Sequence, residues 1–239
     1  MTIKAILFDK DGTLLDYHAT WTEVNLQAAK VGARGNPALA RQLLALADAD
    51  PDTGMAKAGG LLAAGNSAQI AQAWITHGVA WTLESLGAQI DEIFVDAMHR
   101  AIPIPGGAGL IRTLAAQGII MGVASSDSAA AIRVFLDSVG LAEYFQFIAG
   151  YDSGYGHKPD PAALLAFADE IGAAPNEIAM VGDNIQDLQL GRDAGAGMVV
   201  GVLSGTGSAV ELAPLATVVV PDISHLAQLL SKGVVQNGP

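Results

Sequence analysis

The chain has 239 residues, 51% of them apolar, which is enough to fill the core of one sizeable domain or of one domain with an insert. Its formal net charge of −12 disfavours binding to nucleic acids and to anionic membranes, because both are negatively charged and need a basic partner. The absence of cysteine excludes disulfide bonds and thiol chemistry.

The first predicted element is a buried strand over residues 4–8, which runs directly into the sequence DKDGT. This sequence places two carboxylates, Asp9 and Asp11, one residue apart and then offers Gly12 for a turn. Side chains two apart on a strand share a face. The carboxylates would therefore repel each other unless the chain turns sharply or a cation lies between them.

The next stretch, from about residue 20 to residue 99, is predicted to be helical, with no strand. Four segments have apolar residues at spacings of three and four, and Gly, Pro and Asp separate them: 21–33, 36–49, 65–80 and 84–101. A helical insert after the first strand would explain this pattern.

Strands and helices alternate after the prolines at positions 103 and 105. The predicted helices cover 106–118, 128–140, 160–172 and 184–196, and the predicted strands cover 119–125, 145–150, 177–183 and 197–203. Such alternation favours a parallel sheet with helices on both faces. The last residues, 233–239, are expected to form a tail.

Polar side chains follow the predicted strands at their carboxyl ends, where open parallel sheets bind ligands. Ser125 and Ser126 follow the second strand and lead into a helix, whose free N–H groups suit a phosphate. Lys158 follows the third strand, and Asp183 and Asp187 follow the fourth. Together with the first motif they form an acidic cluster suited to Mg²⁺, beside donors suited to a phosphate.

Four of these motifs, taken in order, resemble those of the haloacid dehalogenase superfamily of phosphotransferases. They are DKDGT, the first serine of VASSDS, the lysine of HKPDP, and GDNIQD, and the resemblance covers nearly the whole chain. The helical stretch matches members with a helical cap after the first motif. The expected fold is therefore α/β, a Rossmann-like three-layer parallel sheet core of residues 1–17 and 100–239 with an inserted α-helical cap of residues 18–99, which would close about hinges near residues 17 and 102–105.

The resemblance implies a role for each matched acidic residue and for the lysine. Asp9 would be the nucleophile, and Asp11 the acid that protonates the leaving oxygen and later the base that activates water. Mg²⁺ would be bound by the Asp9 carboxylate, the Asp11 backbone carbonyl and Asp183, with Asp187 holding metal-bound waters. Lys158 would bridge Asp9 and the phosphate.

The phosphoryl oxygens would be bound by Ser125 and by the backbone N–H groups of Ser126 and of Asp11 or Gly12. Ser126 is the alternative residue of the second motif, because the motif can be registered one position later. Members that resemble the dehalogenases lack the second acid of the first motif, and phosphonatase-like members carry a small residue there. Since this chain keeps Asp11, hydrolysis of a phosphomonoester is the favoured reaction.

Two further residues are candidates for contact with the substrate. His18 follows the first motif, where the linker to the cap should pass over the site. Lys57, in the cap, would either meet the carboxylate of a small acid such as phosphoglycolate or be a solvated lysine in a mobile loop. Trp21, Trp74 and Trp81 are expected in packing rather than against the substrate.

We therefore expect a Mg²⁺-dependent phosphatase that hydrolyses a small phosphorylated metabolite, phosphoglycolate-like, through an aspartyl-phosphate. The longest apolar run, residues 194–203, is shorter than the ~20 residues of a membrane helix, and acidic residues come too early for a signal peptide. A cytoplasmic monomer or homodimer without nucleic-acid or membrane partners is expected. A sugar phosphomutase of the same subclass and a non-catalytic binding module are the alternatives.

Overall fold

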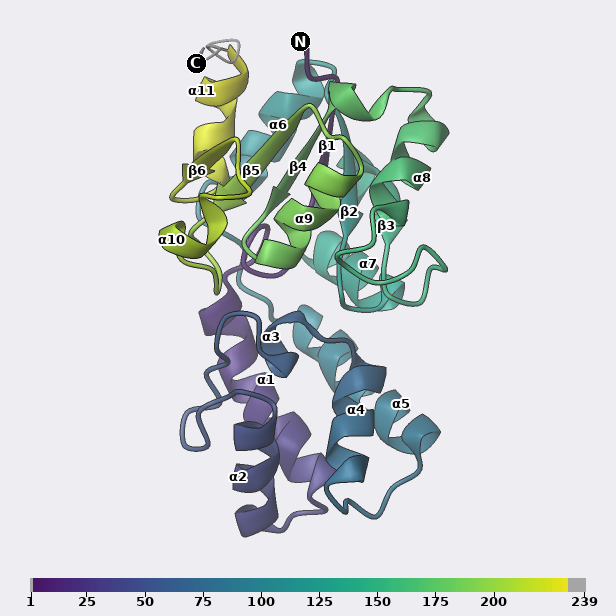
Figure 1. The fold of residues 1–239 in the computed structure, drawn as a ribbon, viewed down its shortest axis with the longest axis vertical. Helices are drawn as coiled ribbons and strands as arrows, with labels where there is room; N and C mark the ends of the chain where they lie inside the picture. The colour runs from purple at the N-terminus through teal and green to yellow at the C-terminus, as the bar shows by residue number, and fades with distance from the viewer. Residues whose placement is uncertain (1, 232–239) are drawn as a thin grey trace.

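The computed structural model describes residues 2–231, and a six-stranded parallel sheet forms its centre (Figure 1). Across the sheet the strands are β3 (Phe145–Ala149), β2 (Ile120–Ala124), β1 (Ala5–Phe8), β4 (Ile178–Gly182), β5 (Met198–Val202) and β6 (Val218–Val220). Strand β1 thus lies in the middle, so that the first motif follows a central strand. The sheet and its helices confirm the expected α/β fold.

Strand β1 is buried on both faces of the sheet, which explains its uninterrupted apolar sequence. Ile6 and Phe8 point into one hydrophobic cluster, and Ala5 and Leu7 point into another. This alternation follows from the two-residue period of a strand.

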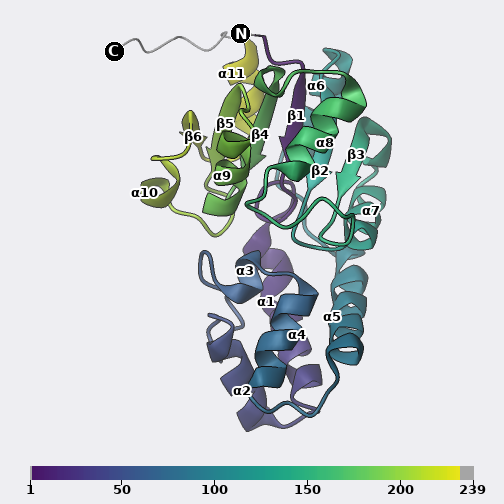
Figure 2. The same ribbon diagram turned by 45° about the vertical axis from the view of Figure 1, so that its right-hand side comes forward.

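Helices cover both faces of the sheet (Figures 1 and 2). Helices α8 (Ala162–Ile171) and α9 (Ile185–Asp193) pack on one face, where their apolar side chains join those of Ala5 and Leu7. Helices α6 (Gly107–Ala116) and α7 (Ala129–Ser138) pack on the other, with α11 (Leu226–Ser231) against α6. The remaining short elements here are α10 (Ala209–Leu212), η1 (Ala142–Tyr144), η2 (Pro175–Glu177) and η3 (Ile223–His225).

Five helices form a separate layer at the carboxyl ends of the strands, below the sheet in Figure 1; we call residues 17–98 the helical unit. They are α1 (Tyr17–Gly32), α2 (Pro37–Leu46), α3 (Leu61–Ala64), α4 (Ser67–Thr76) and α5 (Leu83–Met98). Side chains cap four of them, from Asp16 for α1, Asn36 for α2, Asn66 for α4 and Thr82 for α5. Trp74 is fully buried among them, and its indole donates to the carbonyl of Leu43.

The chain enters and leaves the helical unit at one place. The Asp16 N–H donates to the Ile102 carbonyl at 2.7 Å, and the Ile104 N–H donates to the Leu14 carbonyl at 3.0 Å. The two chain segments that join the sheet to the helical unit, residues 14–16 and 102–104, therefore lie side by side, and we call them the paired crossings. Helix α5 also packs against α7, where the Ser138 hydroxyl donates to the Met98 carbonyl at 3.2 Å.

The structure adds short elements that the sequence patterns did not predict. Strand β6 and helix α3 have three and four residues, too few to show a hydrophobic period. Helix α1 begins at Tyr17, earlier than predicted, because Asp16 accepts a bond from the Ala19 N–H. The tail predicted for residues 233–239 lies outside the described residues.

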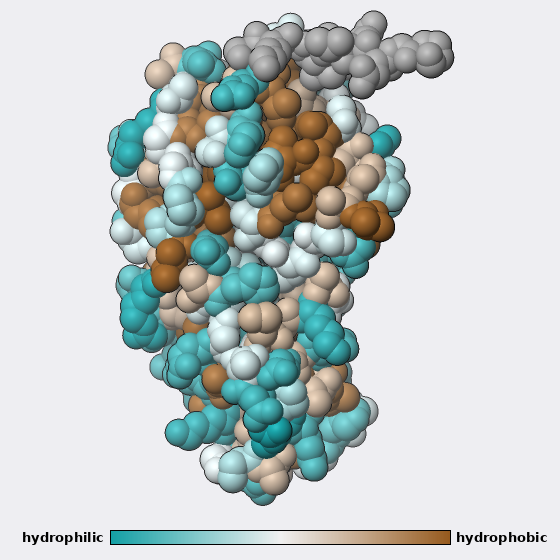
Figure 3. Space-filling view, turned by 90° about the vertical axis from the view of Figure 1, so that its left-hand side faces the viewer, coloured by the Kyte–Doolittle hydropathy of each residue, from teal (hydrophilic) through white to brown (hydrophobic). Residues whose placement is uncertain are grey.

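On the side of the molecule where β6 lies, the hydropathy of the surface differs between the sheet with its helices and the helical unit. On the face viewed in Figure 3, hydrophobic residues gather over the sheet layer, whereas hydrophilic residues cover most of the helical unit. Val218 and Val219 of the edge strand are only partly buried. Within residues 2–231, no helix has the length and apolarity needed to cross a membrane.

Candidate active site

Three buried carboxylates meet at the carboxyl ends of the central strands. Asp9 follows β1, Asp183 follows β4, and Asp187 lies in the first turn of α9. Each contributes one oxygen atom to a group in which all three lie within 4.8 Å of one another. The Asn184 N–H donates to Asp187 Oδ2 at 3.0 Å, which fixes that side chain at the start of its helix.

Lys158 lies between two of these carboxylates. Its Nζ is 2.5 Å from Asp9 Oδ1 and 2.6 Å from Asp187 Oδ1, and only 8% of its side chain is exposed. The lysine precedes α8, where Asp160 accepts a bond from the Ala162 N–H at 2.9 Å. Burial alone would lower the pKa of Lys158, but the charges of Asp187 and Asp9 outweigh burial and raise it, so the ammonium keeps its proton.

The carboxylates carry more negative charge than Lys158 balances. Burial and the charge of Asp187 raise the pKa of Asp183 to about 7, against the N–H of Thr206, which lowers it. Burial raises the pKa of Asp9 as well; Lys158 opposes this rise, and the other carboxylates add to it. Three carboxylates and one ammonium leave a formal charge of minus two, which one divalent cation would cancel.

The donor set therefore fits a divalent cation that prefers oxygen ligands, such as Mg²⁺. A backbone hydrogen bond also fixes the Asp183 side chain, because the Thr206 N–H donates to its Oδ2 at 2.6 Å. Glycine is needed at position 205, because a Cβ there would lie 2.0 Å from the same oxygen. The loop after β5 thus fixes the orientation of Asp183.

Asp11 lies beside the carboxylate cluster but has its own partners. Its Oδ1 accepts bonds from Lys10 Nζ and Trp21 Nε1, each at 2.6 Å, and its Oδ2 accepts a bond from the Ser125 hydroxyl at 3.2 Å. Sequence reasoning gave Lys10 no role, although a lysine at the end of a buried strand is an unusual signal, and it expected Trp21 only in packing.

Gly12 makes the turn after Asp11, with φ of +76°. Its N–H donates to the Leu15 carbonyl at 2.9 Å, so it is already engaged in the turn. Of the two alternative amides in the first motif, that of Asp11 is therefore better placed to bind phosphate than that of Gly12.

The two serines after β2 occupy different positions. Ser125 is buried, and its hydroxyl accepts a bond from the Asp127 N–H at 3.1 Å while donating to Asp11. Ser126 is less buried and lines three cavities at the site. Both therefore remain predicted phosphate ligands.

Three cavities surround these residues, between the sheet layer and the helical unit. One of about 280 Å³ is lined by the carboxylate cluster, Asp11 and Lys158. A second, of about 330 Å³, has aromatic walls from Tyr17, Trp21 and Phe94 beside Asp11.

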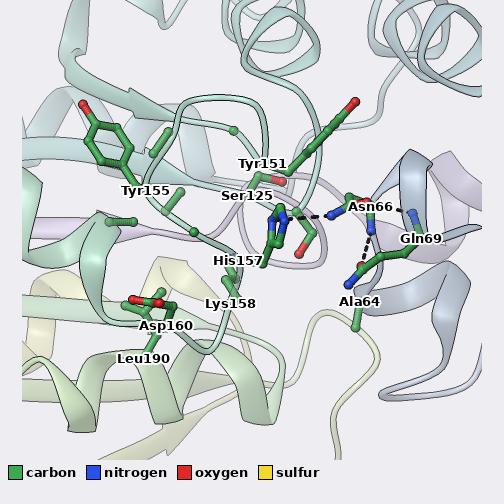
Figure 4. Close-up of a pocket in the computed structure, with 16 residues that line it drawn as sticks. Ala64, Asn66, Gln69, Ser125, Tyr151, Tyr155, His157, Lys158, Asp160 and Leu190 are labelled. Atoms are coloured by element: carbon green, nitrogen blue, oxygen red, sulfur yellow. Dashed lines mark hydrogen bonds between the residues drawn. The ribbon is translucent and has the colours of Figure 1, made fainter. Parts of the chain in front are cut away.

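The third cavity, of about 430 Å³, is shown in Figure 4. Asn66 and Gln69 of the helical unit face His157 and Lys158 across it, and Asn66 Nδ2 lies 3.5 Å from His157 Nδ1. Tyr151, which also lines it, donates to Asp91 of α5 at 2.6 Å. Sequence reasoning missed Asn66 and Tyr151, because only the folded chain brings α4, α5 and the loop after β3 together.

The two residues predicted to touch the substrate lie elsewhere. His18 is exposed, with its ring edge-on to that of Tyr17 at 5.5 Å, and Lys57 is exposed on the loop before α3. Neither lines the three cavities described above. The structure thus brings together Asp9, Asp11, Ser125, Ser126, Lys158, Asp183 and Asp187, but not His18 or Lys57.

Comparison with known proteins identifies the family of the chain. A family model described as haloacid dehalogenase-like hydrolase matches residues 3–195. Phosphoglycolate phosphatase of Rhodospirillum rubrum is 30% identical over 206 residues, which cover 82% of this chain and 78% of the relative. N-acetylmuramic acid 6-phosphate phosphatase of Pseudomonas putida is 27% identical over 197 residues, which cover 82% of this chain and 81% of the relative.

Among solved structures, a predicted phosphoglycolate phosphatase from Haemophilus somnus superposes with a TM-score of 0.74 at 18% identity, over 96% of this chain and 98% of that one. The chain belongs to the haloacid dehalogenase-like hydrolases, as the resemblance of its four motifs implied. Within that family it is a phosphatase, which confirms the predicted class of enzyme.

Proposed function

We propose that the chain is a Mg²⁺-dependent phosphatase that hydrolyses a small phosphomonoester through an aspartyl-phosphate on Asp9. The observation that carries this proposal is the contact of one buried lysine with Asp9 and Asp187, inside a carboxylate cluster whose excess charge matches one divalent cation. The Asp9 carboxylate, the Asp11 backbone carbonyl and Asp183 would bind Mg²⁺, and Asp187, with an oxygen within 4.8 Å of those of Asp9 and Asp183, would hold metal-bound waters. When bound, the ion would neutralise charge between the nucleophile and an anionic phosphate.

Each chemical step has a residue of this chain to perform it. An Asp9 oxygen attacks phosphorus, and the bond between phosphorus and the leaving oxygen breaks as Asp11 gives that oxygen a proton. A water molecule then attacks the same phosphorus, loses its proton to Asp11, and releases phosphate and free Asp9. Lys158, Ser125 and the amides of Asp11 and Ser126 would bind the phosphoryl oxygens.

The helical unit is proposed to act as the cap that selects the substrate, closing about the paired crossings near Tyr17 and Ile102. The cavities lie between the sheet and the helical unit and adjoin the carboxylate cluster, a position that suits a small phosphorylated metabolite. A phosphoglycolate-like ester stays our first candidate because of the relative from R. rubrum, and the relative from P. putida makes a sugar phosphate the second. The cytoplasmic location remains a prediction of the sequence.

The direct test is phosphate release from p-nitrophenyl phosphate and a panel of small esters that includes phosphoglycolate and N-acetylmuramic acid 6-phosphate. We expect turnover that EDTA abolishes and Mg²⁺ restores. Failure of the folded, Mg²⁺-loaded protein to release phosphate from any ester would reject the proposal. Ligand binding without turnover would then indicate a binding module, and transfer between two positions of a sugar would indicate a mutase.

Mg²⁺ is also expected to stabilise the fold in a pH-dependent manner. The pKa of Asp183 is about 7 in the folded, metal-free chain against 3.8 for a free aspartate, so the folded state holds this proton over a pH range where the unfolded state has lost it. Through this group, the metal-free protein loses stability as the pH rises from about 4 to about 7. Mg²⁺ should relieve this loss.

Thermal unfolding with EDTA and with Mg²⁺ measures the effect. The rise in Tm on adding Mg²⁺ should be larger at about pH 8 than at about pH 5. Asp183→Asn should remove most of the difference, whereas Asp169→Asn, an exposed change on α8, should keep it. An equal rise at both pH values would contradict the assignment of Asp183 as a ligand.

A further inference from the structure

Lys10 is a buried cation for which the proposed chemistry has no use. It stands between the two aspartates of the first motif in the sequence, and its side chain is completely buried, which costs free energy unless the charge is paired. Its Nζ lies 2.6 Å from Asp11 Oδ1 and 3.2 Å from Asp127 Oδ2. The ammonium also lies 5.1 Å from the centre of the Trp21 ring.

Trp21 reaches the same oxygen from the helical unit. Its Nε1 donates to Asp11 Oδ1 at 2.6 Å, and the indole is 5% exposed and packs edge-on against Phe94 at 4.7 Å. The other two tryptophans donate to backbone carbonyls, Trp74 to Leu43 and Trp81 to Gly32. Trp21 is therefore the tryptophan of this chain whose indole holds a carboxylate.

These contacts make the two oxygens of Asp11 unequal. An ammonium and an indole N–H are donors only, so a proton on Oδ1 would face two donors and is disfavoured. Oδ2 has the Ser125 hydroxyl, 3.2 Å away, as its partner. A hydroxyl can donate to an ionised Oδ2 and accept from a protonated one, so Oδ2 is the oxygen that can exchange a proton.

We infer that Lys10 and Trp21 are positioning residues that hold Asp11 by Oδ1 and leave Oδ2 to exchange the proton with the leaving group. This inference rests on the proposed function, in which Asp11 is the acid. Lys10 acts from the sheet layer and Trp21 from the helical unit, so the orientation of Asp11 depends on both layers. Asp127 is the counter-charge that keeps Lys10 in place.

The test uses the dependence of kcat/KM on the leaving group. This parameter reports the steps up to departure of the alcohol, and p-nitrophenol departs with little help from an acid, whereas an alkyl alcohol needs a proton. Trp21→Phe keeps the ring and removes the donor. It should lower kcat/KM about tenfold for phosphoglycolate, or for the alkyl ester that the panel ranks highest, and less than about twofold for p-nitrophenyl phosphate.

The matched control is Trp81→Phe, which removes an indole that donates to a backbone carbonyl and should leave both values unchanged. Lys10 is tested in the double variant Lys10→Met/Asp127→Asn, since Lys10→Met alone would leave Asp127 buried without its cation. The double variant should show the same selective loss. Equal losses on both esters, or no loss on the alkyl ester, would overturn the inference.

Two further measurements separate this inference from the proposed function. Asp11→Asn should cause a larger loss on the alkyl ester than Trp21→Phe; if it causes none, the role of Asp11 as acid fails, and the inference with it. NMR of the three indole N–H groups needs no turnover: Asp11→Asn should shift the Trp21 resonance more than those of Trp74 and Trp81. If the Trp21 resonance did not shift in Asp11→Asn, the contact between Trp21 and Asp11 would be rejected, even if the wild-type protein were fully active.

Discussion

Asp9→Asn is expected to lower kcat by about four orders of magnitude or more, because the amide cannot serve as the attacking oxygen. The change is nearly isosteric and removes one of three crowded buried carboxylates, so the fold should persist. No phosphorylated enzyme should accumulate in the variant. Phosphate release measures the first effect, and acid quenching with labelled substrate followed by mass spectrometry measures the second.

Asp169→Asn is the matched control for this experiment. It makes the same chemical change on the exposed side of α8 and should retain full activity. Circular dichroism should show both variants folded. If Asp9→Asn kept more than about a hundredth of the activity, Asp9 would not be the nucleophile, and another group near the cluster would have to carry the phosphoryl group.

Lys158→Met is expected to have the second largest effect, on activity and on stability together. Loss of a fixed charge where charge develops should lower kcat/KM about 10² to 10³-fold. Removal of one partner from a buried ion pair leaves Asp9 and Asp187 without their cation, which should cost about 3 kcal/mol of folding free energy. Urea unfolding with and without Mg²⁺ measures this cost.

Mg²⁺ should stabilise Lys158→Met more than the wild type, because the cluster of three carboxylates then has no other cation. Lys30→Met, an exposed change at the end of α1, should alter neither stability nor activity. Lys158→Arg should recover more of the stability than of the activity, since it restores the charge without the geometry. Full activity in Lys158→Met would show that this lysine is not part of the site.

Much of the site could be predicted because parallel strands end at one edge. Asp9 and Asp183 directly follow two neighbouring strands, so placing those strands in one sheet was enough to bring these carboxylates together. Lys158 lies further along the loop after the edge strand β3, and this loop carries it to the cluster. The contact of Asp187 with Lys158 could not be predicted in this way. It depends on where α9 begins, and sequence patterns locate helix ends only approximately.

The contacts from the helical unit could not be predicted in the same way. Trp21 reaches Asp11 only because α1 leaves the core at one particular angle, and Asn66 meets His157 only because α4 lies against the loop after β3. Helical periodicity states which side of a helix is apolar, but not which distant loop that helix faces. For the same reason Lys57, a candidate ligand by sequence, is exposed and lines none of the three cavities at the site.

The paired crossings of the chain have a consequence for how such an enzyme can change over evolution. The backbones of residues 14–16 and 102–104 are hydrogen-bonded to each other, so the insert that contains the helical unit begins and ends at neighbouring points. Changing the length of chain between these points alters the entropic cost of closing it by only about 0.6 kcal/mol for each doubling. Insertions, deletions and replacements in the insert can therefore accumulate without disturbing the order of the strands, which keep Asp9 and Asp183 together while selectivity diverges.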